Sequence, residues 1–394
     1  MKIKKIKLTS FIKALDLEQE NEIFIEDGLI CKPAKEHTKN FYEVNCQDCI
    51  IAPGFIDPQI NGFGKCNFWD FPDFDEIDKL RVQLAYSGVV AFCPTIITTD
   101  LQRAIKLIEH INSYINQYKR NDGAIIIGIH LEGFFITNYG IHENKYAIKE
   151  LNIKTIQPFI KENIAIFTLA PELDKTGEAI KLIQQNGILV SIGHSNASYC
   201  EGVRAIDEYG LNMVTHMFNG LKGIKGFHHR GENINIDILK SKIENEKNID
   251  ANNDGIILAI LKNKNTMCSV IPDGIHVDKQ VVKFLREYKS GNLFSLTTDL
   301  VASDFFQSAE KQGMLAGGQN LLNDCVSNLV NWGVASLEES LLLASRPISL
   351  KLPMLKNATF GKLSFDSKAN LVIWNTKKNT PKGTIIGDNL FLSY

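Results

Sequence analysis

The sequence predicts an α/β protein: a parallel (β/α)8 barrel with a small β-sandwich built from both ends of the chain. Three observations lead to this prediction. Through the middle of the chain, short apolar runs alternate with amphipathic helix candidates, which is the pattern of a parallel barrel. Both ends instead show short strands separated by polar turns. The length of 394 residues allows one large barrel plus an accessory piece.

The two ends of the chain read as β structure. Residues 2–8 and 22–26 alternate polar and apolar side chains, and Asp27-Gly28 predicts a turn after them. Residues 369–374 have the same character near the other end. Each end is too small to bury a core alone, so we expect residues 1–50 and 356–394 to form one discontinuous β-sandwich domain. Residues 51–355 would then form the barrel.

Eight apolar runs are the candidate barrel strands. They cover residues 50–56, 89–97, 124–131, 164–170, 188–192, 212–214, 266–271 and 293–297. Apolar residues at helical spacing predict helices between or after them, over residues 75–87, 101–118, 176–186, 198–209, 278–288, 321–332 and 337–344. Residues 244–254, rich in Asn, Asp, Lys and Glu, predict a mobile surface loop.

Composition excludes several classes of protein. The 43 Lys and Arg nearly balance the 45 Asp and Glu, so nothing indicates the basic surface that nucleic acid requires. Lysines interrupt the first residues, which argues against a secretion signal, and the longest apolar piece, residues 256–261, is far short of a membrane span. Eight scattered cysteines are typical of free thiols in a reducing compartment, so we expect a cytoplasmic protein with no membrane partner.

Ionisable side chains follow five of the predicted strands. They are Glu132, His194, His216, His276 and Asp299. In a parallel barrel the carboxyl ends of all strands meet on one face, and that face carries the chemistry. The pattern therefore predicts a site, because a barrel selected only for stability has little reason to place such groups there.

The residue types are those of a catalytic divalent metal site. One carboxylate and two imidazoles, Glu132, His194 and His216, would leave coordination positions open. A metal ion there acidifies water and polarises a carbonyl oxygen. Asp299 could take the proton of the water and pass it to a leaving nitrogen, and His276 could hold the carbonyl or another substrate group. These roles specify metal-assisted hydrolysis of a C–N bond.

Other histidines have competing interpretations. We expect His130 to be a hydrogen-bonded structural residue that faces away from Glu132. His228-His229-Arg230 is either an ordinary basic loop or an anion-binding segment, because the guanidinium fork of Arg230 suits a phosphate.

The order of these segments resembles that of the amidohydrolase superfamily. Along the chain come PGFID (53–57), HLEG (130–133), APE (170–172), GHS (193–195), THMFN (215–219), DGIHV (273–277) and TTD (297–299). PGFID is specific only to the superfamily. HLEG, GHS, THMFN and the DGIHVD segment in series resemble the N-acetylglucosamine-6-phosphate deacetylases over nearly the whole chain.

The resemblance implies a role for each matching residue. Glu132, His194 and His216 would be metal ligands and Asp299 the catalytic acid and base. The substrate, an amino-sugar phosphate, would be bound by His142, Asn219, Gly220, Arg230 and His276. The fold would be a TIM barrel of the metal-dependent hydrolase type, working as a homodimer on N-acetyl-D-glucosamine 6-phosphate to give glucosamine 6-phosphate and acetate.

Several residues depart from the family pattern, and they bear on the metal and on the substrate. Gln59 and Asn61 replace the two histidines that often follow the first strand, so we expect one divalent ion. Zinc is the first choice, and iron, cobalt or manganese would also suit these ligands. Phe134, residues 228–233 and residues 300–304 also depart from the pattern, and we expect them to surround the sugar and phosphate pocket. Alternatives are an amidohydrolase acting on a different N-acetylated amino sugar or N-acyl compound, and a non-catalytic scaffold.

Overall fold

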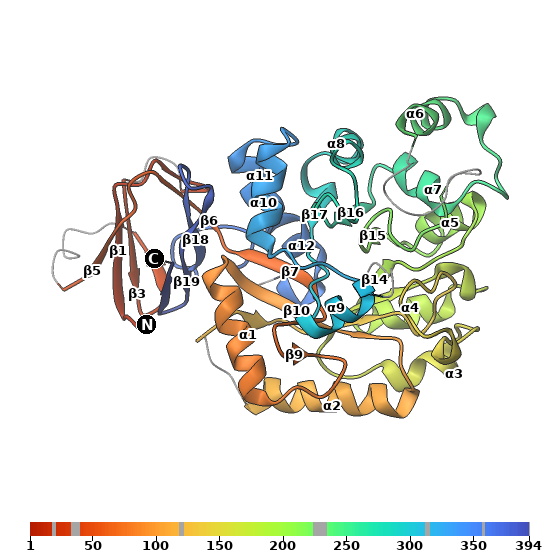
Figure 1. Ribbon diagram of the computed structural model, residues 1–394, viewed down its shortest axis with the longest axis horizontal. Helices are drawn as coiled ribbons and strands as arrows, with labels where there is room; N and C mark the ends of the chain where they lie inside the picture. The colour runs from red at the N-terminus through yellow and green to blue at the C-terminus, as the bar shows by residue number, and fades with distance from the viewer. Residues whose placement is uncertain are drawn as a thin grey trace.

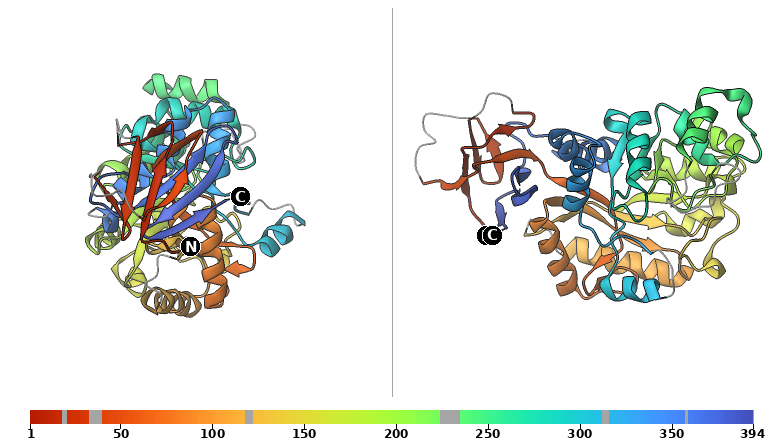
Figure 2. Two further views of the ribbon diagram at one scale, coloured as in Figure 1. Left: turned by 90° about the vertical axis from the view of Figure 1, so that its left-hand side faces the viewer. Right: turned by 45° about the horizontal axis from the view of Figure 1, so that its top comes forward.

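The computed structural model describes residues 1–17, 21–32, 40–117, 122–223, 235–311, 316–356 and 359–393. It consists of a β-sandwich beside a parallel barrel surrounded by helices, with both chain ends in the sandwich (Figures 1 and 2). The amino group of Met1 lies 2.9 Å from the carbonyl oxygen of Leu390, so the two ends meet directly. The predicted fold class is confirmed.

Two sheets form the sandwich. One sheet has the order β4 (Leu29–Cys31), β3 (Glu22–Glu26), β1 (Lys5–Thr9) and β5 (Tyr42–Asn45). The other has the order β2 (Lys13–Ala14), β6 (Cys49–Pro53), β18 (Asn370–Asn375), β19 (Thr380–Ile386) and β20 (Asn389–Leu392). Buried residues of both sheets, including Ile6, Ile25, Ile51 and Ile373, share one apolar cluster. The division into domains of residues 1–50 with 356–394 and of residues 51–355 stays a prediction.

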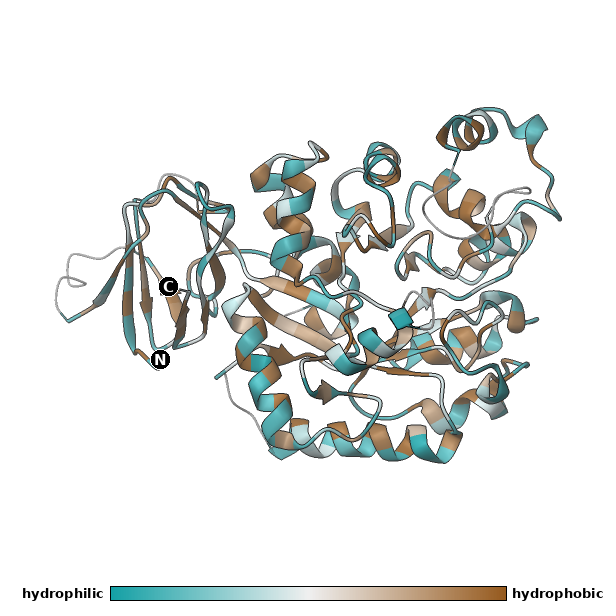
Figure 3. Cartoon of the chain, in the orientation of Figure 1, coloured by the Kyte–Doolittle hydropathy of each residue, from teal (hydrophilic) through white to brown (hydrophobic). Residues whose placement is uncertain are grey.

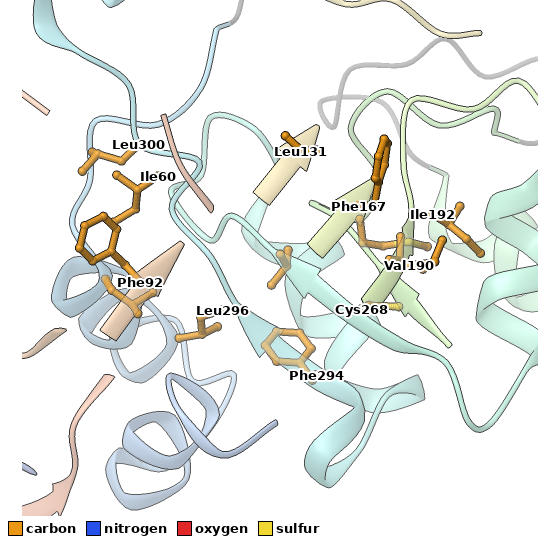
Figure 4. Close-up of a cluster of buried hydrophobic side chains, with 14 of the residues drawn as sticks. Ile60, Phe92, Leu131, Phe167, Val190, Ile192, Cys268, Phe294, Leu296 and Leu300 are labelled. Atoms are coloured by element: carbon orange, nitrogen blue, oxygen red, sulfur yellow. The ribbon is translucent and has the colours of Figure 1, made fainter. Parts of the chain in front are cut away.

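Eight parallel strands make the barrel. They are β7 (Phe55–Ile60), β10 (Val89–Ile97), β12 (Ile129–Glu132), β13 (Ile164–Leu169), β14 (Leu189–Ile192), β15 (Met213–Val214), β16 (Met267–Val270) and β17 (Phe294–Leu296). Short β11 (Ile125–Ile126) pairs with β10, and β8 (Gly62–Phe63) with β9 (Cys66–Asn67) forms a separate hairpin. Figure 4 shows apolar side chains that these strands bury, such as Phe92, Phe167 and Phe294.

Helices surround the barrel. They are α1 (Phe74–Tyr86), α2 (Leu101–Gln117), α3 (Ile153–Ile156), α4 (Glu178–Gln185), α5 (Tyr199–Asp207), α6 (Ile236–Glu244), α7 (Ile256–Lys262), α8 (Lys279–Tyr288), α9 (Ser303–Lys311), α10 (Leu322–Asn331), α11 (Leu337–Leu343) and α12 (Arg346–Lys351). Short 3-10 helices cover Asn144–Tyr146, Gln157–Phe159, Pro171–Leu173, Glu246–Asn248, Gly291–Leu293 and Pro353–Leu355. The apolar and polar sides of α2 are distinct in Figure 3, as the spacing of its buried residues requires.

The first predicted strand is in fact two strands. The run over residues 50–56 is divided at Gly54: β6 pairs with β18 in the sandwich, and β7 pairs with β10 in the barrel. A Cβ atom on Gly54 would lie 2.2 Å from Val90 Cγ1, so only glycine lets the chain cross between the sheets here. Apolarity alone could not reveal the division, because every residue from Cys49 to Ile60 is buried.

Helix α7 was not predicted, because residues 256–261 are all apolar and all buried and so show no helical periodicity. One other expectation needs correction. The presumed loop of residues 244–254 contains a 3-10 helix, and Asp254 is fully buried with its carboxylate 2.6 Å from Lys242 Nζ.

All eight cysteines are free thiols. Among the described residues, no helix has the length and apolar character needed to cross a membrane.

Candidate active site

The carboxyl ends of the barrel strands surround a cavity of about 220 Å³. Eight of the nine predicted site residues line it: Glu132, His142, His194, His216, Asn219, Gly220, His276 and Asp299. The ninth, Arg230, lies outside the described residues, as do His228 and His229. The structure thus brings together residues that are up to 167 positions apart in the chain, counted from Glu132 to Asp299.

Glu132, His194 and His216 converge on one point. Glu132 ends β12, while His194 and His216 each stand two residues beyond their strands, β14 and β15. Glu132 Oε1 lies 2.6 Å from His216 Nε2 and 3.2 Å from His194 Nε2. One ligand atom from each residue falls within 4.8 Å of the others, and all three side chains are buried. This trio could hold a metal ion.

Left-handed backbone conformations aim the side chains of His194, His216 and Asp299 into the cavity. The φ angles are 49° at His194, 30° at His216 and 50° at Asp299, a region that costs non-glycine residues energy. Specific hydrogen bonds hold them there: the His216 amide donates to Ser269 Oγ at 3.0 Å, and the Asp299 carbonyl accepts from the Gly318 amide at 2.8 Å. Such strain, fixed by the surroundings, is typical of functional sites.

The environment of the trio suits a cation. His194 Nδ1 lies 2.9 Å from the Asn138 carbonyl oxygen. Because a carbonyl only accepts, Nδ1 carries the hydrogen and Nε2 keeps a lone pair toward Glu132, which is the usual arrangement of a metal-ligating histidine. The donor set of one carboxylate and two imidazoles therefore fits a divalent metal ion.

The charges of the trio interact strongly. Burial by itself would raise the pKa of Glu132, but its interactions with His194 and His216 outweigh burial and lower that pKa well below its ordinary value. Burial opposes the charged form of His216, yet the hydrogen bond and the charge of Glu132 raise the pKa of His216 to about 9. The carboxylate is thus an anion that attracts positive charge at this point.

Asp299 is held beside the trio by two amide side chains. Gln59 Nε2 donates to Glu132 Oε2 at 2.9 Å and to Asp299 Oδ1 at 2.7 Å. Asn61 Nδ2 also donates to Asp299 Oδ1 at 2.7 Å, and Trp69 Nε1 donates to Asn61 Oδ1 at 3.2 Å. Burial, reinforced by the negative charge of Glu132, raises the pKa of Asp299 to about 6. Gln59 and Asn61 therefore act as hydrogen-bond donors to carboxylates.

The predicted substrate-contacting residues lie around this centre. His142 Nε2 is 3.2 Å from His194 Nε2, and His276 Nδ1 is 2.6 Å from Asp273 Oδ2. Asn219 Nδ2 donates to the His216 carbonyl at 3.2 Å. Gly220 has φ of 59°, and a Cβ atom there would lie 2.8 Å from His194 Nδ1, so glycine is required beside the imidazole.

Sequence reasoning missed several residues of the cavity wall, among them Ile97, Trp69, Asn138 and Gly317. The Gly317-Gly318 pair could have been noticed as a close approach of the backbone. By contrast, Asn138 contacts His194 through its backbone carbonyl, which no residue type can signal.

The predicted orientation of His130 was wrong, and so was the predicted place of Phe134. Residues two apart on a strand share a face, so His130 points into the barrel below Glu132. There His130 Nε2 lies 2.7 Å from Thr168 Oγ1, and Nδ1 lies 2.9 Å from the Pro58 carbonyl oxygen, which makes it the hydrogen-bonded structural residue that we expected. Phe134 packs on Phe159 at a ring distance of 4.7 Å and does not line the cavity.

The chain is similar in sequence to proteins named N-acetylglucosamine-6-phosphate deacetylase. The one from Caenorhabditis elegans is 28% identical over 330 residues, which cover 78% of this chain and 72% of the relative. The mouse protein is 29% identical over 387 residues, covering 89% and 87%. No protein-family model matches the chain.

Solved structures show the fold class. The deacetylase from Pasteurella multocida superimposes with a TM-score of 0.80 at 20% identity over 99% of this chain and 100% of its own. A Mycobacterium smegmatis deacetylase mutant in complex with N-acetyl-D-glucosamine-6-phosphate gives 0.77 at 17% identity over 99% and 100%. Enamidase, an amidohydrolase-superfamily member, gives 0.60 at 10% identity over 98% and 95%. The chain has the barrel fold of the amidohydrolase superfamily. Within that superfamily, its sequence resembles the N-acetylglucosamine-6-phosphate deacetylases.

Proposed function

We propose that this protein hydrolyses the amide bond of N-acetyl-D-glucosamine 6-phosphate and releases glucosamine 6-phosphate and acetate. The observation that carries the proposal is the convergence of Glu132, His194 and His216 in one cavity with a buried Asp299 beside them. The deacetylases that the chain resembles in sequence support the choice of reaction, and the M. smegmatis complex supports the choice of substrate.

Glu132, His194 and His216 would hold one divalent metal ion, with zinc as the first choice and iron, cobalt or manganese as alternatives. When bound, the ion would acidify a water molecule and polarise the acetyl carbonyl. The Gln59 amide fills the space between the Glu132 and Asp299 carboxylates as a hydrogen-bond donor, which supports a single ion.

The residues of the chain would move the proton and orient the substrate. Asp299 accepts a proton from the attacking water as the oxygen bonds to the acetyl carbon. It then gives that proton to the nitrogen as the C–N bond breaks, so that an amine and acetate leave. His276, oriented by Asp273, would donate to a substrate oxygen, as would His142.

Asn219 and Gly220, which line the cavity, would bind the sugar phosphate, and Arg230 would pair with the phosphate. In keeping with the family resemblance, we also propose a cytoplasmic homodimer. Val301 lines the cavity within the segment of residues 300–304, which departs from the family pattern, so substrate preference is the finer point to test.

An acetate-release assay tests the proposal directly. The purified protein, loaded in turn with zinc, iron, cobalt or manganese, is given N-acetylglucosamine with and without the 6-phosphate, and N-acetylgalactosamine 6-phosphate. We expect metal-dependent release that is fastest with N-acetylglucosamine 6-phosphate. Faster release from an unphosphorylated sugar would reassign the substrate. If no acetate is released with any metal, the result would contradict the deacetylase proposal and favour a non-catalytic scaffold.

A further inference from the structure

We propose that Thr98 is a positioning residue: by contacting His142 Nδ1 through both its hydroxyl and its backbone N–H, it fixes His142 as the Nε2–H tautomer. His142 would then offer the cavity a hydrogen-bond donor and would not be a metal ligand. The acceptor would be an oxygen of the substrate, and this part of the proposal rests on the function proposed above. The tautomer itself does not depend on that function.

The contacts of Thr98 define where the proton of His142 lies. Thr98 follows β10 directly and is buried. Its backbone N–H, which can only donate, points to His142 Nδ1 at 3.4 Å. Its hydroxyl oxygen lies 2.9 Å from the same nitrogen and accepts from the Phe134 amide at 2.9 Å, which leaves the hydroxyl hydrogen for His142. Nδ1 is therefore an acceptor, and the ring hydrogen lies on Nε2.

The neighbouring imidazole has the opposite tautomer. His194 Nδ1 donates to the Asn138 carbonyl, so His194 Nε2 has the lone pair. The 3.2 Å contact between the two Nε2 atoms is accordingly a hydrogen bond from His142 to His194. If a cation takes the lone pair of His194, the Nε2–H of His142 loses this acceptor and is left for a ligand in the cavity. The two adjacent histidines thus have different roles: His194 can ligate a metal ion, and His142 can donate a hydrogen bond.

Gly133 leaves room for the contact between Thr98 and His142. A Cβ atom at Gly133, where φ is 100°, would lie 2.1 Å from Thr98 Oγ1 and 2.9 Å from His142 Nδ1. Any larger side chain would separate the hydroxyl from the ring. The glycine of the HLEG segment is therefore explained by the Thr98–His142 pair, an observation independent of the hydrogen bonds themselves.

The test reads the tautomer by NMR and the activity by kinetics. The full-length protein is labelled with ¹⁵N-histidine, and two-bond ¹H–¹⁵N spectra are recorded without metal and with zinc. A His142→Gln variant assigns the signals of His142. Thr98→Val removes the hydroxyl, Thr98→Ser keeps it, and Thr95→Val is the matched control, because Thr95 is a buried threonine of β10 whose hydroxyl contacts only the Cys93 carbonyl among the described residues.

We expect His142 of the parent protein and of Thr98→Ser to carry its hydrogen on Nε2 in both spectra. Thr98→Val should show a mixture of tautomers and a kcat/KM lower by about tenfold, the effect of one lost hydrogen bond, with unchanged zinc content. Thr95→Val should retain both the spectrum and kcat/KM.

A hydrogen on Nδ1 of His142 in the parent protein would overturn the proposal, as would a Thr98→Val variant with an unaltered tautomer. If Thr98→Val fails to fold because the Phe134 amide loses its acceptor, the spectra of the parent protein and of Thr98→Ser still decide. If the parent protein lacks deacetylase activity while His142 shows Nε2–H, the proposed function fails and the tautomer assignment stands.

Discussion

At the residue scale, one amide group joins the two carboxylates of the site. Gln59 Nε2 donates to both Glu132 and Asp299, and Asn61 donates to Asp299 as well. These bonds hold Asp299 in place but bring no positive charge to it, because the donors are uncharged amides. Burial and the charge of Glu132 therefore still raise the pKa of Asp299 to about 6. A carboxylate whose pKa lies near working pH can both accept and return a proton, which is what the proposed reaction asks of it.

Replacing Asp299 by Asn should abolish turnover and leave the metal in place. Asn keeps the size of the side chain and an acceptor oxygen for Gln59 and Asn61, but it cannot take a proton. We expect kcat to fall by about 10³-fold or more, with metal content by elemental analysis equal to that of the parent protein. Asp366→Asn, which changes an exposed carboxylate that does not line the cavity, is the control. Substantial turnover by Asp299→Asn would remove this residue from the acid and base role.

The pH dependence of kcat/KM should show the ionisation of Asp299. The carboxylate form is needed as the base, and its pKa is raised to about 6, so the rate should fall as pH drops below that value. The expected slope is about tenfold per pH unit. A bound cation favours the charged carboxylate and would move the midpoint to a lower pH. A rate that increases as pH falls through 6 would contradict this assignment.

At the element scale, a side chain supports the seam at which the barrel closes. The seam between β7 and β17 has one parallel bridge, Ile60 to Leu300, among the described residues. The Asp57 carboxylate strengthens it by accepting from Thr298 Oγ1 at 2.6 Å and Thr297 Oγ1 at 3.1 Å. Because Thr298 immediately precedes Asp299, the same carboxylate supports the position of the proposed base.

Asp57→Ala should weaken this seam. We expect a loss of about 2–3 kcal/mol in the free energy of unfolding, measured by urea denaturation, because several buried donors lose their acceptor. Burial raises the pKa of Asp57 from 3.8 to about 6, so the folded chain binds this proton more tightly than the unfolded chain. The stabilising contribution of Asp57 is therefore greatest at low pH and declines as pH rises through about 6.

The difference between the parent protein and Asp57→Ala should accordingly be larger at pH 5 than at pH 7.5. Asp57→Asn, which keeps one acceptor oxygen, should lose less than Asp57→Ala. Equal stability of all three proteins at both pH values would show that the seam does not depend on this residue.

At the scale of the whole molecule, the site joins parts of the chain that fold as separate strands. Glu132 ends β12, and His194 and His216 follow β14 and β15, so one bound ion would cross-link three strands of the barrel. The sandwich is a second such junction, since its core combines residues from both ends of the chain. Long-range contacts of this kind make stability a property of the complete chain.

Metal should stabilise the folded protein. Zinc at about 100 times its dissociation constant should add about 2.7 kcal/mol, seen as a higher melting temperature than in chelator-treated protein. His194→Gln removes one ligand and should lose most of this increase, whereas Asp299→Asn should keep it. A melting temperature that zinc leaves unchanged in the parent protein would contradict a metal site at the trio.

Much of the architecture was predictable because it depends on local patterns. Helical spacing placed α1, α2, α8, α10 and α11 to within one residue at each end, and the order of polar residues after the strands indicated which side chains would meet. The rule that parallel strands end on one face is what turned that order into a site.

Periodicity and strand ends are local features, so they were enough to predict the fold class and to predict that Glu132, His194, His216 and Asp299 share one cavity. The division at Gly54, the bridging of two carboxylates by Gln59 and the opposite tautomers of His142 and His194 emerge only in three dimensions. These depend on strand register and on distances of a few ångströms between residues far apart in the chain, including backbone atoms that are the same for every residue type.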